Sequence, residues 1–159
     1  MDGYFGIGIY HGKSEVNIGT LWRGAWQLGA AFIFTVGRRY KDQVSDTYKT
    51  WRNIPRFEYE SLGDLQNAWP YNCQSVAIEM GGDPLISFKH PKRAVYILGA
   101  EDNGLPESVI NMCGDIVSIP AIRQPSFNVA QAGTIVMYDR LVKSGAIEIG
   151  SCTPWQESG

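Results

Sequence analysis

The 159-residue sequence is poor in cysteine and histidine, and it contains no long uncharged apolar run. Its cysteines, Cys73, Cys113 and Cys152, are odd in number and lack paired spacing, which argues against a disulfide framework and a zinc site. His11 and His90 have no Cys or Glu neighbour at ligand spacing, so we expect no metal. The lack of a segment long enough for a membrane span or a signal peptide favours a soluble, cytoplasmic protein without membrane contact.

Several common catalytic signatures are missing as well. The pattern G-x-x-x-x-G-K-[ST] does not occur, which excludes a P-loop NTPase. No G-x-G-x-x-G follows an expected strand, so the usual dinucleotide fold is disfavoured. No serine stands in a nucleophile elbow. Any catalytic site of this chain must therefore work without a P-loop, a dinucleotide-binding glycine motif or a nucleophile elbow.

The composition that remains is that of an ordered globular protein. Hydrophobic residues make up 44% of the chain, and five of its residues are tryptophan. A chain of this length normally forms one domain with a sizeable core. We expect a single domain over residues 1–150 and a polar, flexible tail over 151–159.

Apolar periodicity predicts strands that alternate with helices. The expected strands cover residues 4–10, 31–36, 75–80, 94–98 and 115–119, with a short extended piece at 54–59. The expected helices begin at Asn17 as an N-cap, at Ser61 as an N-cap, at Pro106 and at Ser126, and the glycines after Met80 should end a strand. This order predicts an α/β fold whose mostly parallel sheet is covered by helices on both faces.

The charge of the chain is unevenly distributed. Residues 37–56 contain six Lys or Arg and two Asp, a net charge of +4, whereas the whole chain has a net charge of −2. Tyr40, Tyr48 and Trp51 lie between these cations. A basic segment with aromatic residues suits phosphates and exposed bases, although a solvated loop would explain the same pattern.

A glycine-containing turn follows the strand expected at 94–98. Gly99, an acidic pair and Gly104 precede Pro106, where a helix can begin. A strand, a glycine turn and a helix can present backbone groups to a ligand at the edge of an α/β sheet. The same residues could equally form nothing more than a tight connection.

Three stretches taken together resemble a known family. They are residues 17–23 (NIGTLWR), residues 98–106 (LGAEDNGLP), and residues 119–120 (IP) followed by 126–130 (SFNVA). Their order and spacing are similar to the three motifs of the SpoU/TrmH branch of the SPOUT methyltransferases. The resemblance implies a deep trefoil knot at the C-terminal end, a homodimer with its active site at the subunit interface, and S-adenosylmethionine (AdoMet) as cofactor. The reaction implied is methylation of a ribose 2′-hydroxyl of RNA, and the small size of the chain favours tRNA over rRNA.

The resemblance also assigns residues to roles. The catalytic set it implies consists of Arg23, Asn17, Glu101, Ser126 and Asn128. The backbone that would hold the cofactor belongs to Met80, Gly81, Leu98, Gly99, Gly104, Leu105, Ile119 and Phe127. The RNA-binding candidates come from the basic segment and are Arg38, Arg39, Lys41, Arg52 and Arg56. Because a guanidinium keeps its proton at neutral pH, we expect Arg23 to hold phosphate and stabilise a developing alkoxide, not to act as a base.

Simpler explanations exist for several of these residues. Asn17 and Ser126 could be helix caps, and Glu101 could be a solvated turn acid. The chain also departs from the family pattern at Thr20, at Ala130 and in the short segment 120–126. Two other functions remain open: a catalytically weak RNA-binding dimer of the same fold, and a methyltransferase that acts on a small molecule.

Overall fold

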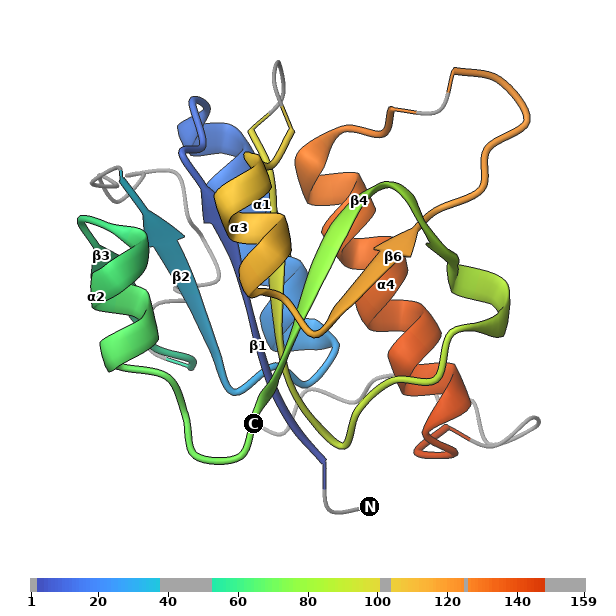
Figure 1. The fold of residues 1–159 in the computed structure, drawn as a ribbon. Coiled ribbons are helices and arrows are strands. Elements are labelled where there is room, and N and C mark those ends of the chain that lie inside the picture. Colours follow the sequence, from blue (N-terminus) through green and yellow to red (C-terminus); the bar gives the residue numbers. More distant parts are fainter. Residues whose placement is uncertain (1–2, 38–52, 101–103, 125, 148–159) are drawn as a thin grey trace.

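A computed structural model describes residues 3–37, 53–100, 104–124 and 126–147. Six strands form one sheet in the order β3-β2-β1-β5-β4-β6, and every strand pair is parallel (Figure 1). The strands are β1 (Tyr4–Tyr10), β2 (Phe32–Val36), β3 (Arg56–Tyr59), β4 (Gln74–Pro84), β5 (Arg93–Leu98) and β6 (Asp115–Ser118). The expected α/β class and parallel sheet are therefore confirmed.

Helices cover both faces of this sheet, as expected. They are α1 (Glu15–Gln27), α2 (Leu62–Asn67), α3 (Glu107–Met112) and α4 (Val129–Lys143), with a short 3-10 helix at Leu85–Ser87. Figure 1 shows α2 and α3 in front of the sheet and α1 and α4 behind it. Within the described ranges, none of the helices is long and apolar enough to cross a membrane.

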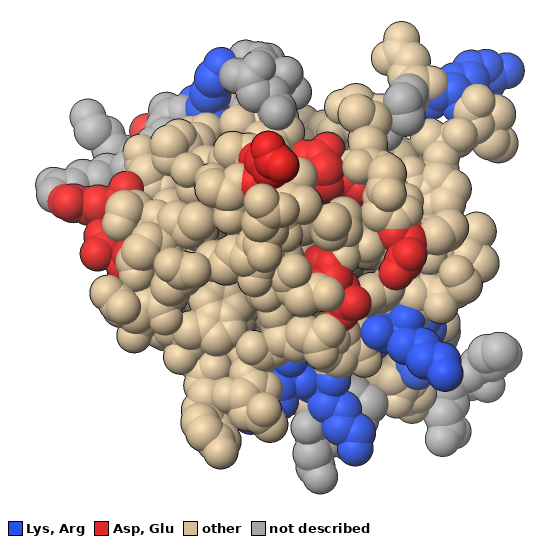
Figure 2. Space-filling view, viewed as in Figure 1, with Lys and Arg blue, Asp and Glu red and all other residues tan. Residues whose placement is uncertain are grey.

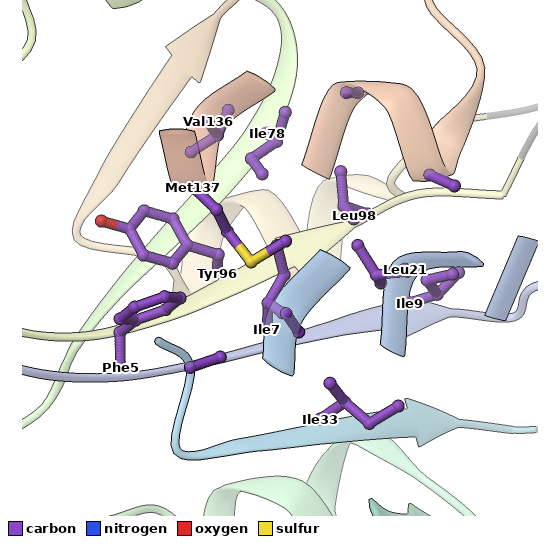
Figure 3. Close-up of a cluster of buried hydrophobic side chains, with 14 of the residues drawn as sticks. Phe5, Ile7, Ile9, Leu21, Ile33, Ile78, Tyr96, Leu98, Val136 and Met137 are labelled. Atoms are coloured by element: carbon purple, nitrogen blue, oxygen red, sulfur yellow. The ribbon is translucent and has the colours of Figure 1, made fainter. Parts of the chain in front are cut away.

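Alternate residues of each strand divide the core into two layers. On β1, the buried side chains of Phe5, Ile7 and Ile9 belong to the layer under α1 and α4. On β2, the side chains of Phe32 and Phe34 belong to the layer under α2 and α3. Figure 3 shows the first layer, in which helix residues lie against side chains from the strands. Burial on both faces explains why the strands read as nearly continuous apolar runs.

The start of α1 differs from the prediction. Ser14, not Asn17, is the N-cap, and its side-chain oxygen accepts a hydrogen bond from the backbone N–H of Asn17 at 3.3 Å. The prediction of Asn17 as a cap was wrong because two capping residues stand close together and either could begin the helix. Ser61 caps α2 as predicted, and accepts from the N–H of Asp64.

The start of α4 was also misplaced. The helix begins at Val129, and Asn128 is its N-cap, so Ser126 lies before the helix and does not cap it. The Oδ1 atom of Asn128 accepts from the backbone N–H groups of Ala130 and Gln131, at 3.0 and 3.2 Å. Asn and Ser are comparable capping residues, so composition alone could not choose between them.

Strand β4 contains a bulge that the sequence did not predict. Ile78 pairs with Val117 of β6, and Asp83 then pairs with the same residue, so the residues between them are displaced from the ladder. Gly81 has φ +86°, and a Cβ on Gly82 would lie 2.5 Å from the carbonyl oxygen of Ile116. The two glycines thus bend the strand and do not end it, because pairing resumes with β6.

Candidate active site

A pocket opens at the carboxyl edge of the sheet, where β4, β5 and β6 end. Its volume is about 620 Å³. It is lined by Ile78, Glu79, Met80, Gly81, Leu98, Gly99, Ala100, Gly104, Ser118, Ile119, Pro120, Ala121, Ser126, Phe127, Val129 and Ala132. All of these residues lie between positions 78 and 132 of the chain. Because the carboxyl ends of parallel strands meet at one edge, such an edge is the usual place for a ligand in an α/β sheet.

The pocket gathers most of the residues predicted to hold the cofactor. Met80 and Gly81 come from the bulge of β4, and Leu98 and Gly99 from the end of β5. Gly104, Ile119 and Phe127 complete the set that lines the pocket. Leu105 stands behind the wall, where its side chain is buried with the core under α2 and α3. Segments far apart in sequence thus form one cavity.

Among the lining residues that sequence reasoning did not predict, Glu79 is the charged one. Glu79 stands at the start of the β4 bulge, and its Oε2 atom accepts a hydrogen bond from the N–H of Leu105 at 2.8 Å. Its Oε1 atom accepts from the N–H of Met80 at 2.9 Å. The signal available in the sequence was an acid at the end of an otherwise apolar strand. An acid in this position is usually interpreted as a solvent-exposed residue at the end of a strand.

Asn17 and Asn128 connect the first and third motifs. The Nδ2 atom of Asn128 donates a hydrogen bond to Oδ1 of Asn17 at 3.1 Å, across 111 positions of sequence. Since Asn128 also caps α4, its amide is held at both ends. The structure therefore brings together two of the residues predicted to be catalytic.

The other predicted catalytic residues occupy different positions. Arg23 lies on the exposed side of α1, on the same helix as Asn17. Ser126 is exposed and lines the pocket. The prediction for Glu101 falls outside the described residues.

Most of the predicted RNA-binding residues also fall outside the described ranges, namely Arg38, Arg39, Lys41 and Arg52. The predicted tail at 151–159 is outside them too. Arg56 is described, and its guanidinium lies 5.1 Å from the centre of a ring of Trp22 and 3.4 Å from a carboxylate oxygen of Glu58. Only 17% of the Arg56 side chain is exposed, and its guanidinium is in contact with Trp22 and Glu58.

Charged residues are dispersed on the face that carries α2 and α3. Figure 2 shows Asp and Glu on the middle of this face, and Lys and Arg at its margins. Among the described residues, this distribution provides no continuous basic surface on that face. Phosphate contacts from these residues would be few and separate.

Two described cysteines are poor nucleophiles. Burial raises the pKa of the Cys113 thiol to about 11, and burial also raises the pKa of Cys73. The Cys113 thiol is therefore protonated at neutral pH, whereas nucleophilic attack needs a thiolate. In the described part of the chain, no group of three or more His, Cys, Asp and Glu side chains is arranged to hold a metal ion.

Comparison with known families identifies the chain. The model of the SpoU rRNA methylase family matches residues 5–138. The chain belongs to this family, so the resemblance drawn from the three motifs is confirmed. The fold of the family includes the trefoil knot expected near the C-terminal end. A comparison with curated protein sequences gives no match.

Solved structures of the family share this fold at low identity. The SpoU methyltransferase AviRb from Streptomyces viridochromogenes, in complex with AdoMet, is 23% identical, with a TM-score of 0.80 over 92% of this chain and 60% of that one. The TrmH/SpoU tRNA-modifying enzyme of A. aeolicus is 17% identical, with a TM-score of 0.77 over 89% of this chain and 76% of that one.

A structure reported for the 2′-OH methylation of C/U34 on tRNA is closer to this chain in size. It is 20% identical, with a TM-score of 0.76, and the match covers 91% of this chain and 99% of that one. By contrast, this chain spans about 60% of the length of AviRb. Identities at this level establish the shared fold alone.

Proposed function

We propose that this protein transfers a methyl group from AdoMet to a ribose 2′-hydroxyl of RNA. The observation that carries the proposal is the pocket at the carboxyl edge of the sheet. It is walled by the second and third motifs, and the Asn17–Asn128 hydrogen bond joins the first motif to the third. Membership of the SpoU family and the AdoMet bound to AviRb support the same assignment.

The pocket suits a nucleoside-containing cofactor. Its volume of about 620 Å³ lies in the range of small-molecule sites. Leu98, Ile119 and Phe127 provide apolar walls for a base, and the glycine-containing turns expose backbone groups for its polar edges. When bound, AdoMet supplies a methyl group on a sulfonium, which can be transferred by direct displacement.

The task of the protein is then to position the acceptor and stabilise its developing charge. Asn17 and Asn128 form a fixed amide pair beside the pocket that can orient substrate. Arg23 holds a phosphate and stabilises the alkoxide that forms as the 2′-hydroxyl loses its proton. In this proposal Ser126 would bond to other site residues, and Glu101 would position Arg23 or the backbone of its loop.

We assign tRNA as the substrate, ahead of rRNA. The support is the match in size with the protein studied for methylation of C/U34 on tRNA, of which 99% is covered. The basic segment that includes Arg38, Arg39, Lys41 and Arg52 is the proposed RNA contact. Arg56 contributes less, because its guanidinium already contacts Trp22 and Glu58.

We further propose that the protein acts as a homodimer with the active site at the subunit interface. Apolar side chains on the outer sides of α1 and α4 support this assembly. Val16 is 64% exposed, Tyr138 is 56% exposed and Val142 is 50% exposed. Tyr138 and Val142 are one helical turn apart on α4 and so share a face. A second copy would remove these side chains from water.

The first test is incubation of the protein with labelled AdoMet and total RNA, followed by mapping of the modified nucleotide. We expect label on a ribose 2′-oxygen in the tRNA fraction. Label in rRNA would overturn the choice of tRNA. Absence of label from every RNA fraction would overturn the RNA methyltransferase itself.

The second test concerns Arg23. Arg23→Ala should abolish methyl transfer and leave AdoMet affinity nearly intact, because the proposed role of Arg23 is on the RNA side of the reaction. Lys89→Ala, which removes an exposed cation from the β4–β5 connection, is the matched control and should retain activity. An Arg23→Ala protein that methylates at the wild-type rate would contradict the role of Arg23.

A further inference from the structure

Glu79 is the one charged residue among the described residues that line the pocket. It follows Ile78, the last β4 residue in register with β6 before the bulge. The bulge turns Glu79 toward the connection between β5 and α3. The carboxylate of Glu79 therefore lies between two walls of the pocket, the end of β4 and the turn before α3.

We propose that Glu79 is a positioning residue that fastens the Gly104 wall to β4 through the backbone of Leu105 and thereby sets the shape of the cofactor pocket. This inference rests on the proposed function. Its basis is the hydrogen bond of 2.8 Å from the N–H of Leu105 to Oε2. The second oxygen is held by the N–H of Met80 at 2.9 Å, so the carboxylate is fixed on its own strand. Hydrogen bonds to an ionised acceptor are stronger than those between neutral groups.

Gly104 makes this tether possible. Its φ is +61°, and a Cβ placed there would lie 2.5 Å from Oε2 of Glu79. Glycine accepts this φ without strain and leaves the space that the carboxylate fills. Glu79 and Gly104 are therefore complementary in shape, and a side chain at position 104 would displace the acid.

The turn fastened by Glu79 is closed on its other side as well. Gly104 donates its N–H to the carbonyl oxygen of Ala100 at 3.2 Å, and these two residues form an isolated antiparallel bridge. A Cβ on Gly99 would lie 2.4 Å from the carbonyl carbon of Gly104. The end of β5, the Ala100–Gly104 bridge and β4 are thus in contact, and among the described residues Glu79 joins this turn to β4.

The inference predicts a pattern of cofactor affinities. Glu79→Ala removes the acceptor and should weaken AdoMet binding about tenfold, which corresponds to the loss of one charge-assisted hydrogen bond. Glu79→Gln keeps an amide oxygen that can accept from the N–H of Leu105, and should bind within about threefold of wild type. Glu107→Gln, at an exposed acid in the first turn of α3, is the matched control and should bind like wild type.

The measurement is titration calorimetry of AdoMet into each full-length protein, at a temperature well below every unfolding midpoint. If the wild type binds AdoMet and Glu79→Ala binds equally well, the inference is overturned and the proposed function stands. Glu79→Gln binding as weakly as Glu79→Ala would also overturn it, since the tether would then not be the cause. A wild type that fails to bind AdoMet would overturn the assigned cofactor, and the inference with it.

A double-mutant cycle tests the fit between the two residues directly. Gly104→Ala should weaken AdoMet binding in the wild-type protein. It should weaken binding by a smaller factor in the Glu79→Ala protein, because the carboxylate that meets the new Cβ is gone. Equal factors in both backgrounds would show that Glu79 and Gly104 act independently, and would overturn the proposed contact.

Discussion

Asn128 uses the two ends of its side-chain amide for two different tasks. Its oxygen accepts from two backbone N–H groups at the start of α4, and its nitrogen donates to Asn17 on α1. The first task stabilises a helix, and the second joins two segments of the proposed active site. One residue can thus influence both stability and activity, and suitable substitutions can separate the two.

We predict different effects for two substitutions of Asn128. Asn128→Ala removes the cap and should lower the free energy of unfolding by about 1 kcal/mol. Asn128→Asp keeps the acceptor oxygen and should retain most of that stability. It cannot donate to Asn17, so its rate of methyl transfer should fall by about tenfold. Urea unfolding and transfer of labelled methyl to RNA measure the two quantities. An Asp variant with full activity would show that the amide pair has no part in the reaction.

At the scale of elements, Arg140 fastens the β4–β5 connection to α4. It is 5% exposed. Its Nη2 atom donates to the carbonyl oxygen of Lys92 at 2.8 Å. Its Nη1 atom donates to the carbonyl oxygen of Pro91 at 2.6 Å and to the hydroxyl oxygen of Tyr96 at 3.1 Å. The guanidinium also lies over the ring of Phe5. These contacts give a buried cation several partners, which burial of a charge requires.

His90 extends the same network, and its burial favours the neutral form of the imidazole. Nε2 lies 2.7 Å from Oδ2 of Asp139 and donates to it, because an ionised carboxylate can only accept. Nδ1 then accepts from the Tyr96 hydroxyl at 2.7 Å, and that oxygen accepts from Arg140. Burial lowers the pKa of His90 below its usual 6.5, while the bond to Asp139 opposes this shift and the charges of Arg140 and Lys143 reinforce it.

This lowered pKa predicts a dependence of stability on pH. Below about pH 6.5 the unfolded chain binds a proton at His90, whereas the folded chain binds it only at lower pH. The unfolded state therefore holds more protons in this interval, and stability should fall as the pH decreases through it. One such proton contributes at most about 1.4 kcal/mol per pH unit.

Denaturant unfolding between pH 7.5 and 5 measures this dependence. His90→Gln should flatten it in this interval. If His90→Gln leaves the slope of the unfolding free energy against pH unchanged, groups other than His90 cause the pH dependence.

The same elements show what the sequence could and could not predict. Strands β2 and β5 were predicted because burial on both faces produces an apolar run that local pattern reveals. The cap of α1 was misassigned because Ser14 and Asn17 suit it equally, and the side chain of Asn17 contacts Asn128, far away in sequence. The β4 bulge was not predicted, because β4 continues past the glycines only through pairing with β6, and this long-range contact has no local sequence signature.

The site followed the same division. Gly99 and Phe127 were predicted to hold the cofactor because the family fixes the order of its motifs along the chain, and both line the pocket. Glu79 was not predicted, because its partner Leu105 is reached only after the strands have been placed side by side. Local chemistry predicts which residues can bond, and the tertiary fold decides which of them meet.

At the scale of the whole molecule, the proposed dimer makes a prediction about mixed subunits. If Arg23 of one subunit completes the pocket of the other, a mixed dimer of Arg23→Ala and Phe127→Glu chains contains one intact site. Random pairing of equal amounts should restore about one quarter of the wild-type activity. Each variant alone should be inactive, because the second puts a charge into an apolar wall of the pocket.

The measurement is methyl transfer to RNA after the two proteins are unfolded together and refolded, with separately refolded proteins mixed afterwards as control. Sedimentation at several concentrations should report twice the mass of the chain. No recovery in dimers that contain both chains would contradict a shared site. A protein that sediments as a monomer while active would contradict the dimer.

The position of the pocket in the sequence has a consequence for synthesis. Its described lining residues all lie between positions 78 and 132, and the helix that supports its last wall, α4, extends to Lys143. Chains emerge from the ribosome amino end first, so β1 to β3, α1 and α2 are made before any part of the pocket exists. A nascent chain can therefore complete the pocket only after the start of α4 has been made, and until then it lacks part of the proposed cofactor site.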